Sequence, residues 1–393
     1  MESVELFAGG GGLALGLHRA GFNPSAVVEW DADSCQTLRK NWIEGMGSRP
    51  EWPVWQGDVR DMEFAQFAGK VALVSGGPPC QPFSIGGKHR GFLDGRDMFP
   101  QAVRVVRAIR PQAFVFENVR GLLRRSFAKY FSYILLQLNY PEIIRKTSED
   151  WTEHLSRLEA HHTGGSDRGL MYRVVFRKLN AADYGVPQKR ERVVIVGFRS
   201  DIREPWCFPE PSHSEDALLA AKWISGSYWD EHHVPQAKRA EPPDELRGRL
   251  SRVEALPFTA RWRTVRDGIG DLPDPRRPEA SRIPNHRFQS GARTYTGHTG
   301  SPLDEPAKTL KAGDHGVPGG ENMLCHPNGS VRYFTVRESA RLQTFPDWYQ
   351  FPSSWTESMR QIGNAVPVRL GETIGRSVAE TLNRHATRSV KGN

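Results

Sequence analysis

The sequence contains few cysteines, and they lie far apart. Four occur in 393 residues, and none forms a C-x-x-C pair. Disulfide frameworks and structural zinc sites generally require closely spaced cysteines. The spacing therefore argues against both kinds of site and favours a reducing compartment.

Long apolar runs are missing as well. No apolar stretch reaches the roughly 20 residues that a membrane-spanning helix needs. The N-terminus reads MESVELFAGGGG, and its glycines leave no room for the apolar core of a signal peptide. We therefore expect no membrane segment, a cytoplasmic location, and no regulatory domain ahead of the first strand.

The residues that are present suit a soluble globular protein with a polyanionic partner. Hydrophobic residues make up 38% of the chain and charged residues 25%, and the length allows two domains. The net charge is +8 and the isoelectric point about 9.4. This charge favours nucleic acid as a partner, with a nonspecifically basic surface as the alternative.

The first 200 residues alternate short apolar runs with helical patterns. A helical pattern over 99–111 separates two of the apolar runs. The runs that read as strands are 3–8, 26–30, 70–77, 112–119 and 192–198. This alternation predicts an α/β fold with an open, doubly wound, mostly parallel sheet of the Rossmann type.

Residues 201–330 have a different texture, rich in proline, glycine, arginine and histidine. Polar, proline-rich composition is typical of a disordered linker. The segment also contains large aromatic residues, which favour a packed, loop-rich second domain. These residues are Trp223, Tyr228, Trp229, Trp262 and Tyr295.

A glycine turn follows the first apolar run. In FAGGGG, Gly9, Gly11 and Ala14 match G-x-G-x-x-A, and Glu29 lies 20 residues after Gly9. Glycines let the backbone approach a ligand, and a carboxylate at that distance binds ribose hydroxyls. The pattern predicts a nucleoside-containing cofactor, either NAD or S-adenosylmethionine. Asp58 follows another apolar stretch and reads either as a ligand contact or as a helix cap.

Three further features point to covalent chemistry at the same sheet edge. In GGPPCQPFS, prolines on either side of Cys80 place it on a loop. Glu117 ends the apolar run AFVF, where desolvation raises a carboxyl pKa. Arg190 and Arg192 project from one side of a strand. A thiolate, a carboxylic acid and arginines suit nucleophilic addition to an electron-poor ring.

The ordered motifs resemble those of the DNA cytosine-5 methyltransferase family, in its bacterial and phage modification type. They are ELFAGGGG, VVEWD, GDV, GGPPCQPFS, FENV, QKRERVVIVG, RESARLQTFPD and GNAVPV, and they span nearly the whole chain. The resemblance implies S-adenosylmethionine as cofactor, S-adenosylhomocysteine as product, no metal, and double-stranded DNA as substrate. It also implies a nucleoid-associated monomer that is functionally paired with a restriction endonuclease.

The resemblance assigns a role to each candidate catalytic residue. Cys80 would add to C6 of a flipped-out cytosine, so that C5 takes the methyl group and 5-methylcytosine is released. Glu117 would hold or protonate N3, and Arg192 would contact O2. Arg190 would support the thiolate and Glu117.

Binding residues and domains follow from the same resemblance. Cofactor contacts are expected from Phe7, Gly9, Gly11, Glu29, Trp30, Asp58, Pro79 and Asn364. DNA contacts are expected from Ser84, Lys88, Arg293, His298, Lys308, Thr309, Leu310 and Lys311. The expected domains are a catalytic and cofactor-binding domain over 1–200, a target-recognition domain over 201–355 that includes RESARLQ, and a C-terminal helix over 356–393 that returns to the first domain. Residues 145–169 read as an insertion on the surface.

Three alternatives remain on sequence grounds. A relative that methylates a tRNA cytosine would carry similar motifs. An NAD-dependent dehydrogenase would explain the glycine turn and Glu29, but not PPC, ENV or QKRER. A catalytically inactive DNA-binding protein would not need the cysteine, the glutamate and the arginines together.

Overall fold

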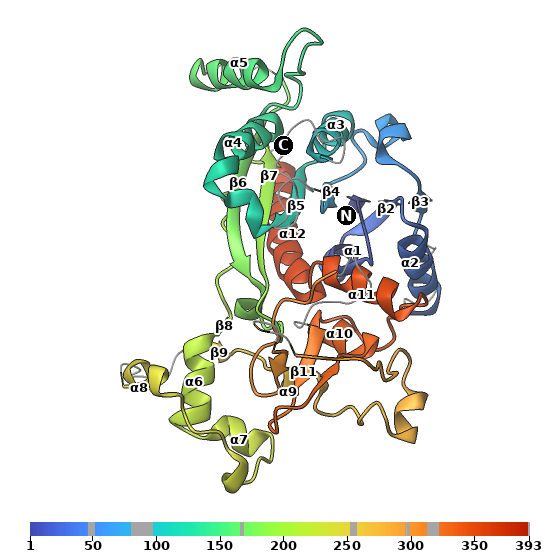
Figure 1. Ribbon diagram of the computed structural model, residues 1–393. Helices are drawn as coiled ribbons and strands as arrows, with labels where there is room; N and C mark the ends of the chain where they lie inside the picture. Colours follow the sequence, from blue (N-terminus) through green and yellow to red (C-terminus); the bar gives the residue numbers. More distant parts are fainter. Residues whose placement is uncertain are drawn as a thin grey trace.

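A seven-stranded sheet forms the centre of the larger body in the computed structural model (Figure 1). The structure describes residues 1–45, 52–79, 97–165, 169–251, 258–294, 296, 299–312 and 322–391. The strand order is β3-β2-β1-β4-β5-β7-β6. The strands are β1 (Glu2–Leu6), β2 (Asn23–Glu29), β3 (Val54–Gln56), β4 (Leu73–Gly76), β5 (Ala113–Val119), β6 (Tyr172–Asn180) and β7 (Glu191–Arg199).

The sheet is mostly parallel, as the alternation of apolar and helical patterns predicts. Strands β1 to β5 pair in parallel, whereas β7 runs antiparallel between β5 and β6. The connection from β6 to β7 spans only residues 181–190 and carries no crossover helix. A parallel pair needs a crossover of about a dozen residues or more, so these two strands pair as antiparallel neighbours.

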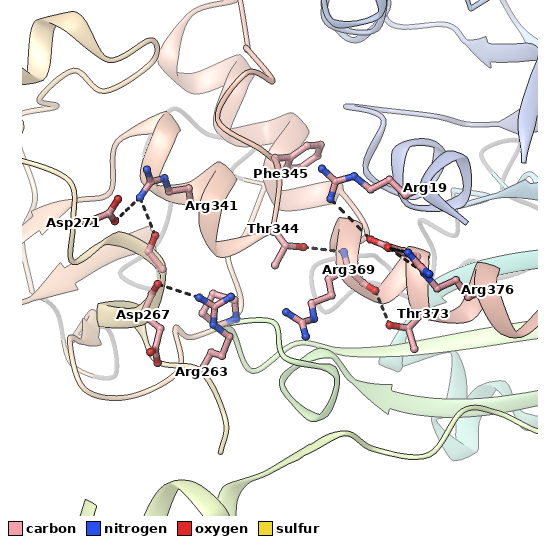
Figure 2. A pocket seen from close by; sticks show the side chains of 13 residues that line it. Arg19, Arg263, Asp267, Asp271, Arg341, Thr344, Phe345, Arg369, Thr373 and Arg376 are labelled. Atoms are coloured by element: carbon pink, nitrogen blue, oxygen red, sulfur yellow. Dashed lines mark hydrogen bonds and ion pairs between the residues drawn. The ribbon is translucent and has the colours of Figure 1, made fainter. Parts of the chain in front are cut away.

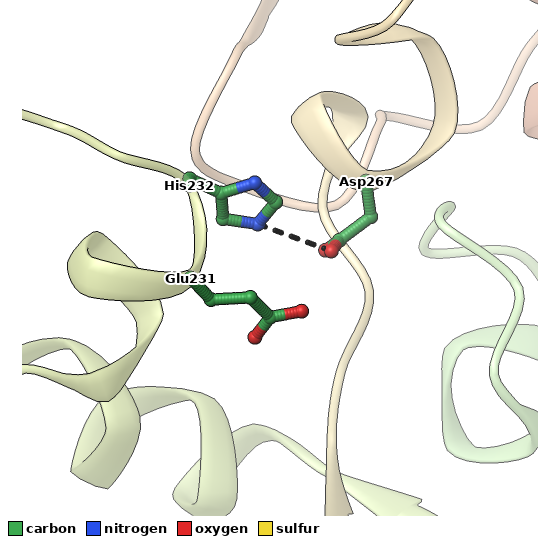
Figure 3. Close-up of side chains that lie close together, drawn as sticks. All are labelled: Glu231, His232 and Asp267. Carbon is green, nitrogen blue, oxygen red and sulfur yellow. Dashed lines mark ion pairs between the residues drawn. The ribbon is translucent and has the colours of Figure 1, made fainter.

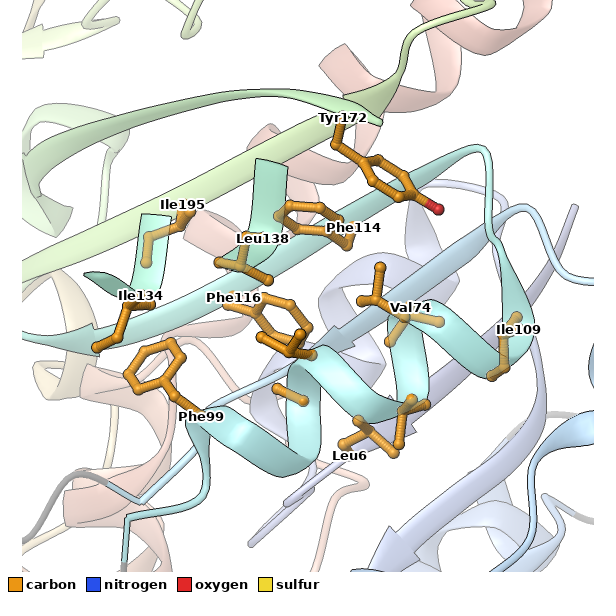
Figure 4. Packing of buried hydrophobic residues seen from close by; sticks show 14 of the residues in the cluster. Leu6, Val74, Phe99, Ile109, Phe114, Phe116, Ile134, Leu138, Tyr172 and Ile195 are labelled. Atoms are coloured by element: carbon orange, nitrogen blue, oxygen red, sulfur yellow. The ribbon is translucent and has the colours of Figure 1, made fainter. Parts of the chain in front are cut away.

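Helices cover both faces of the sheet. On one face lie α3 (Phe99–Ile109) and α4 (Ala128–Asn139), and Figure 4 shows their apolar side chains packed against Phe114 and Phe116 of β5. On the other face lie α1 (Gly12–Arg19) and α12 (Val368–Lys391). A Cβ at Gly16 would lie 2.5 Å from the Val368 carbonyl oxygen, so glycine lets these two helices approach closely.

The segment that reads as an insertion forms α5 (Trp151–Thr163), which extends from α4 (Figure 1). Asp150 begins the helix with a capping box to Glu153. His154 anchors it, since one ring nitrogen lies 2.8 Å from the Tyr133 hydroxyl and the other 2.8 Å from the Ile143 carbonyl. The remaining helix of the first body is α2 (Ala32–Gly45), which packs beside β3.

The second body contains short elements joined by loops (Figure 1). Tyr228, Trp229 and Trp262 are buried in one cluster, so this segment packs rather than forming a disordered linker. A second cluster contains Leu310 and Phe334. The elements are β8 (His213–Ser214), α6 (Glu215–Trp223), α7 (Ser227–Glu231), α8 (Asp244–Leu250), β9 (Ala260–Arg261), α9 (Val265–Ile269), β10 (Ser301–Pro302), β11 (Met323–Cys325), β12 (Val331–Tyr333) and α10 (Val336–Leu342).

The chain then returns to the first body through α11 (Trp355–Asn364) and α12. Helix α11 packs with α10, and α12 packs along α1. Among the described residues, no helix combines the length and apolar character that crossing a membrane requires.

Candidate active site at the carboxyl edge of the sheet

The predicted cofactor and catalytic segments meet at one edge of the sheet. Strands β1, β2, β4 and β5 are parallel, so their carboxyl ends lie together. Ligands in open α/β sheets bind outside such an edge. The glycine turn follows β1, Glu29 ends β2, the cysteine loop follows β4, and Glu117 lies near the end of β5.

The Glu29 carboxylate ties the glycine turn to the next strand. It accepts the backbone N–H groups of Gly9 at 2.7 Å, and of Trp30 and Asp31 at 2.9 Å each. Burial raises the pKa of Glu29, while these three donors act in the opposite direction. A carboxylate offers about four acceptor positions, so a position remains for a ligand hydroxyl.

The glycines serve two distinct purposes. Gly9 has a φ of +52°, and a Cβ there would meet no atom within 4 Å, so the space above it is open. Gly11 has a φ of +80°, and a Cβ there would lie 2.6 Å from the Tyr349 hydroxyl. Gly9 therefore leaves room for a ligand, whereas Gly11 lets the C-terminal region pack against the turn.

The C-terminal region packs against the glycine turn. The Tyr349 hydroxyl donates to the Gly10 carbonyl at 2.9 Å, and a Cβ at Gly12 would lie 2.2 Å from the Val366 carbonyl oxygen. The motif RESARLQTFPD ends just before Tyr349, but sequence reasoning missed this contact because its partner lies 339 residues away. Asn364 is exposed at the end of α11 in the same segment.

The other predicted cofactor residues differ in their surroundings. The Trp30 side chain is 75% exposed, so one ring face is open to a ligand. Phe7 has a φ of +54°, a strained conformation for a non-glycine residue that marks the start of the turn. Asp58 caps a short 3₁₀ helix (Val59–Asp61) and pairs with Arg60, which holds the pKa of Asp58 below its usual range.

Glu117 and Arg192 form a buried ion pair at the predicted catalytic position. The Arg192 Nε lies 2.7 Å from the Glu117 Oε1, and both residues are at most 9% exposed. Burial raises the pKa of Glu117, and Arg192 and Arg190 oppose that rise. Burial thus favours the protonated form of this carboxyl, as a group that donates a proton to a substrate requires.

The loop toward Cys80 starts beside this pair. A Cβ at Gly77 would lie 3.4 Å from the Glu117 Oε2, and the Asn118 side chain donates to the Pro78 carbonyl at 2.9 Å. The Pro79 carbonyl accepts from the N–H of Met98 at 3.2 Å. Cys80, Ser84 and Lys88 lie outside the described residues. Asn118 fixes the start of the cysteine loop, a role that ENV does not reveal.

Arg190 is completely buried and binds three backbone oxygens, which belong to two segments. Its guanidinium donates to the carbonyls of Leu310 at 3.0 Å, Gly363 at 2.6 Å and Ala365 at 2.9 Å. Gln188 adds a link, because its Oε1 accepts from the N–H of Leu310 at 3.1 Å. Both residues thus join the sheet to the second body, and the support of a thiolate by Arg190 stays a prediction.

The residues predicted to contact DNA differ in how deeply they are buried. Leu310 is 1% exposed in the core of the second body, so its side chain is covered by protein here, and its contact with DNA stays a prediction. The Thr309 hydroxyl donates to the Lys189 carbonyl at 2.7 Å, and the Lys308 Nζ donates to Thr299 at 3.0 Å. Arg293 and Lys311 are exposed, and His298 lies outside the described residues.

Glu231, His232 and Asp267 lie close together in the second body, with ligand atoms at metal-binding separation (Figure 3). Arg261 already satisfies the two carboxylates. It donates to both Asp267 oxygens at 2.8 Å and to Glu231 at 2.9 Å. A guanidinium thus supplies the positive charge here, and the cluster acts as an ion-pair network.

The sequence matches the C-5 cytosine-specific DNA methylase family over residues 1–140 and 166–380. It is 35% identical over 387 residues to Type II methyltransferase M.PspPI of Psychrobacter sp. (strain TA137), covering 97% of this chain and 79% of that protein. It is 33% identical over 382 residues to Type II methyltransferase M.Eco47II of Escherichia coli, with the same coverages. The chain therefore belongs to the C-5 cytosine-specific DNA methylase family, as an enzyme of the bacterial modification type.

Solved structures agree on the fold. A DNA modification methyltransferase encoded within an E. coli prophage aligns with a TM-score of 0.57 at 21% identity, covering 98% of this chain and 99% of that one. The S. pombe Dnmt2 methyltransferase aligns with a TM-score of 0.54 at 16% identity, with the same coverages. At these identities the likeness shows the fold alone.

These findings confirm the resemblance and the methyltransferase fold predicted from the motifs. Enzymes of this family methylate C5 of cytosine in DNA with S-adenosylmethionine as methyl donor, which removes the dehydrogenase alternative. The comparisons do not favour the RNA-methylating alternative. The family match leaves out residues 141–165, a stretch that contains α5.

Proposed function

We propose that this enzyme methylates a flipped-out cytosine in a specific duplex DNA sequence through a covalent bond between Cys80 and C6. The observation that carries the proposal is the buried Glu117–Arg192 pair beside the loop that leads to Cys80. This arrangement puts an acid and a cation where the polar edge of a cytosine would enter.

The residues act in sequence on the ring. The Cys80 thiolate attacks C6, and the pair of electrons displaced from the C5–C6 bond makes C5 nucleophilic. Glu117 holds or protonates N3, and Arg192 binds O2, so both stabilise the negative charge that addition creates. S-adenosylmethionine supplies, when bound, the electrophilic methyl group that C5 takes up. Loss of the C5 proton and departure of the thiolate restore the aromatic ring.

The cofactor site fits the methyl donor. The open space above Gly9, the free acceptor position on Glu29 and the exposed ring of Trp30 suit a nucleoside with an amino-acid tail. We assign ribose hydroxyls to Glu29, an adenine face each to Phe7 and Trp30, and the adenine amino group to Asp58. The walls of the cofactor site would be completed by Gly11, Pro79 and Asn364.

Base flipping follows from the position of the reacting atoms. C6 and C5 lie inside a stacked duplex, so an enzyme that reacts with them must extrude the base. We assign backbone and base contacts to residues of the loop after Cys80 and of the second body. They are Ser84, Lys88, Arg293, His298, Lys308, Thr309, Leu310 and Lys311.

We propose the division into a catalytic domain over 1–200, a recognition domain over 201–355 and a returning helix over 356–393. The strands of the large sheet all precede residue 200, which supports the first boundary. Because the curated relatives are Type II methyltransferases, we assign the enzyme to the modification arm of a restriction system. It would act as a cytoplasmic, nucleoid-associated monomer beside a restriction endonuclease.

Methyl transfer to duplex DNA tests the proposal. Cys80→Ala should abolish transfer from labelled S-adenosylmethionine while DNA binding persists. Cys207→Ala, which removes an exposed cysteine, should transfer at the wild-type rate. Bisulfite sequencing of DNA from expressing cells should show 5-methylcytosine within one recognition sequence. Near wild-type turnover by Cys80→Ala, or equal turnover on tRNA and DNA, would contradict the proposal.

A further inference from the structure

A basic pocket lies at the junction of the two bodies, away from the catalytic edge. Figure 2 shows side chains that line it. Its volume is about 770 Å³. Arg19 and Arg369 border it from α1 and α12, and Arg19 stands at the end of α1 that is remote from the glycine turn. Five arginines line the pocket: Arg19, Arg263, Arg341, Arg369 and Arg376.

Three of these arginines have carboxylate partners. Arg341 pairs with Asp271 at 2.6 Å, and Arg376 pairs with Glu372 at 2.6 Å. Arg19 lies 3.9 Å from the same Glu372. Their charge is largely neutralised before any ligand enters.

Arg263 and Arg369 have no such partner. Among the described residues, the Arg369 guanidinium makes neither a hydrogen bond nor an ion pair, and Arg263 donates only to the Asp267 backbone carbonyl, at 3.3 Å. The Asp267 carboxylate is not available, because Arg261 holds both of its oxygens. Figure 2 shows the Arg263 and Arg369 guanidinium groups projecting into the same pocket from opposite bodies.

A histidine lies next to Arg369, outside the pocket lining. A Cβ at Gly185 would lie 2.7 Å from the His213 Cε1 and 2.8 Å from the Arg369 Cζ, so both side chains converge over this glycine. Burial, together with Arg369 and Arg263, lowers the pKa of His213 to about 4. Burial and Arg263 lower the pKa of Arg369, and Glu372 opposes that shift. Two cationic guanidinium groups that lack a directly paired carboxylate create a position that an anion would stabilise.

We infer that this pocket binds a phosphate-type oxyanion, held by Arg263 from the second body and Arg369 from α12. Planar guanidinium groups donate in pairs to tetrahedral oxyanions, which suits two arginines that face one cavity. Both a free polyphosphate and a DNA backbone phosphate have this chemistry. The position of the pocket beside the end of α1 remote from the glycine turn favours a small free anion. Such an anion would bridge the two bodies and stabilise their arrangement.

Thermal unfolding in inorganic pyrophosphate, with ionic strength held constant by chloride, tests the inference. Pyrophosphate should raise the Tm of the wild-type protein, because a ligand that binds only the folded state stabilises it. Arg369→Gln and Arg263→Gln should each remove most of that rise. Arg384→Gln is the matched control, since it removes the same charge from α12 outside the pocket, and it should keep the full rise.

The outcomes distinguish binding of the anion in this pocket from nonspecific attraction of anions to a basic protein. Absence of a rise in the wild-type protein, or an equal rise in all three variants, would overturn the inference. If one of the two pocket variants does not fold, the other still tests the inference. Affinity for duplex DNA identifies the source of the anion. If Arg369→Gln binds DNA as tightly as the wild-type protein, the pocket takes a free anion. If Arg369→Gln binds DNA more weakly, and pyrophosphate weakens DNA binding by the wild-type protein to the same extent, the pocket takes a DNA phosphate.

Discussion

The two bodies of this enzyme hold their charged residues in different ways. At the edge of the large sheet, Glu117 and Arg192 project from neighbouring strands, so the backbone ladder sets their separation. In the second body, pairs such as Arg332–Glu338 join short elements and loops. The regular strands of the sheet thus position Glu117 and Arg192 for chemistry. In the second body, ion pairs help to hold the short elements together.

The largest expected effect is on catalysis at the sheet edge. Glu117→Gln keeps the size of the side chain but removes the acid, so methyl transfer should fall by about 100- to 10,000-fold. The change also leaves the buried Arg192 charge without its partner, so the Tm should fall too, and the kinetics are measured well below the Tm of the variant. Steady-state kinetics with duplex DNA provides the measurement. Glu191→Gln changes a half-buried neighbour paired with Lys178, and it should lose less than about threefold by comparison. An equal loss in both variants would contradict the role of Glu117.

The next effect concerns stability in the second body. Glu338 is 1% exposed and accepts both guanidinium nitrogens of Arg332 at 2.7 Å. Glu338→Gln leaves the Arg332 charge buried without its partner and should cost about 3–5 kcal/mol of unfolding free energy. Asp244→Asn breaks an exposed pair with Arg247 and should change it by less than about 1 kcal/mol. Denaturant unfolding of both variants measures the contrast, and similar losses would contradict it.

A third effect distinguishes a buried acid in the sheet from the paired acids of the second body. Glu5 is fully buried, is hydrogen-bonded to Ser75, and burial raises its pKa to about 8. Between about pH 4.5 and 8 the unfolded chain therefore loses the proton before the folded one, so this group makes stability fall as pH rises. Glu5→Gln should raise the Tm at pH 8 and change it little at pH 4.5. A gain that is independent of pH would contradict this assignment.

The smallest effect separates capping from ligand binding at Asp58. Asp58→Ala removes a cap and an exposed pair with Arg60, and it should cost about 1 kcal/mol. Asn caps as well as Asp, so Asp58→Asn should stay within about 0.5 kcal/mol of wild type. If Asp58 also binds the adenine amino group, both variants should raise the KM for S-adenosylmethionine. An unchanged KM would leave Asp58 with the cap alone.

The sequence predicts the sheet edge better than the second body. Apolar runs placed β5 and β7 correctly. The period of two along a strand predicts Arg190 and Arg192 on the same side, but β7 begins at Glu191, so Arg190 lies just before the strand. The same period could not show that Arg190 turns to three carbonyls while Arg192 pairs with Glu117, because those carbonyls lie at least 120 residues away.

Other features depend on contacts that no local pattern records. The antiparallel direction of β7 follows from a short connection without a helix, and the apolar run alone does not reveal it. Leu310 reads as part of a DNA-contacting pair, yet its side chain is buried and its carbonyl binds Arg190. The aromatic residues of the second body did indicate packing, because burying Tyr228 and Trp229 removes much apolar surface from water.

Covalent trapping on DNA that carries 5-fluorocytosine tests the central claim most directly. Fluorine at C5 blocks loss of the C5 substituent, so the thiolate cannot leave after methyl transfer. With S-adenosylmethionine present, the wild-type enzyme and Cys207→Ala should each form a stable DNA adduct, and peptide mass spectrometry should place it on Cys80. Cys80→Ala should form none. An adduct on another residue, or no adduct from an active enzyme, would contradict addition of Cys80 to the cytosine ring.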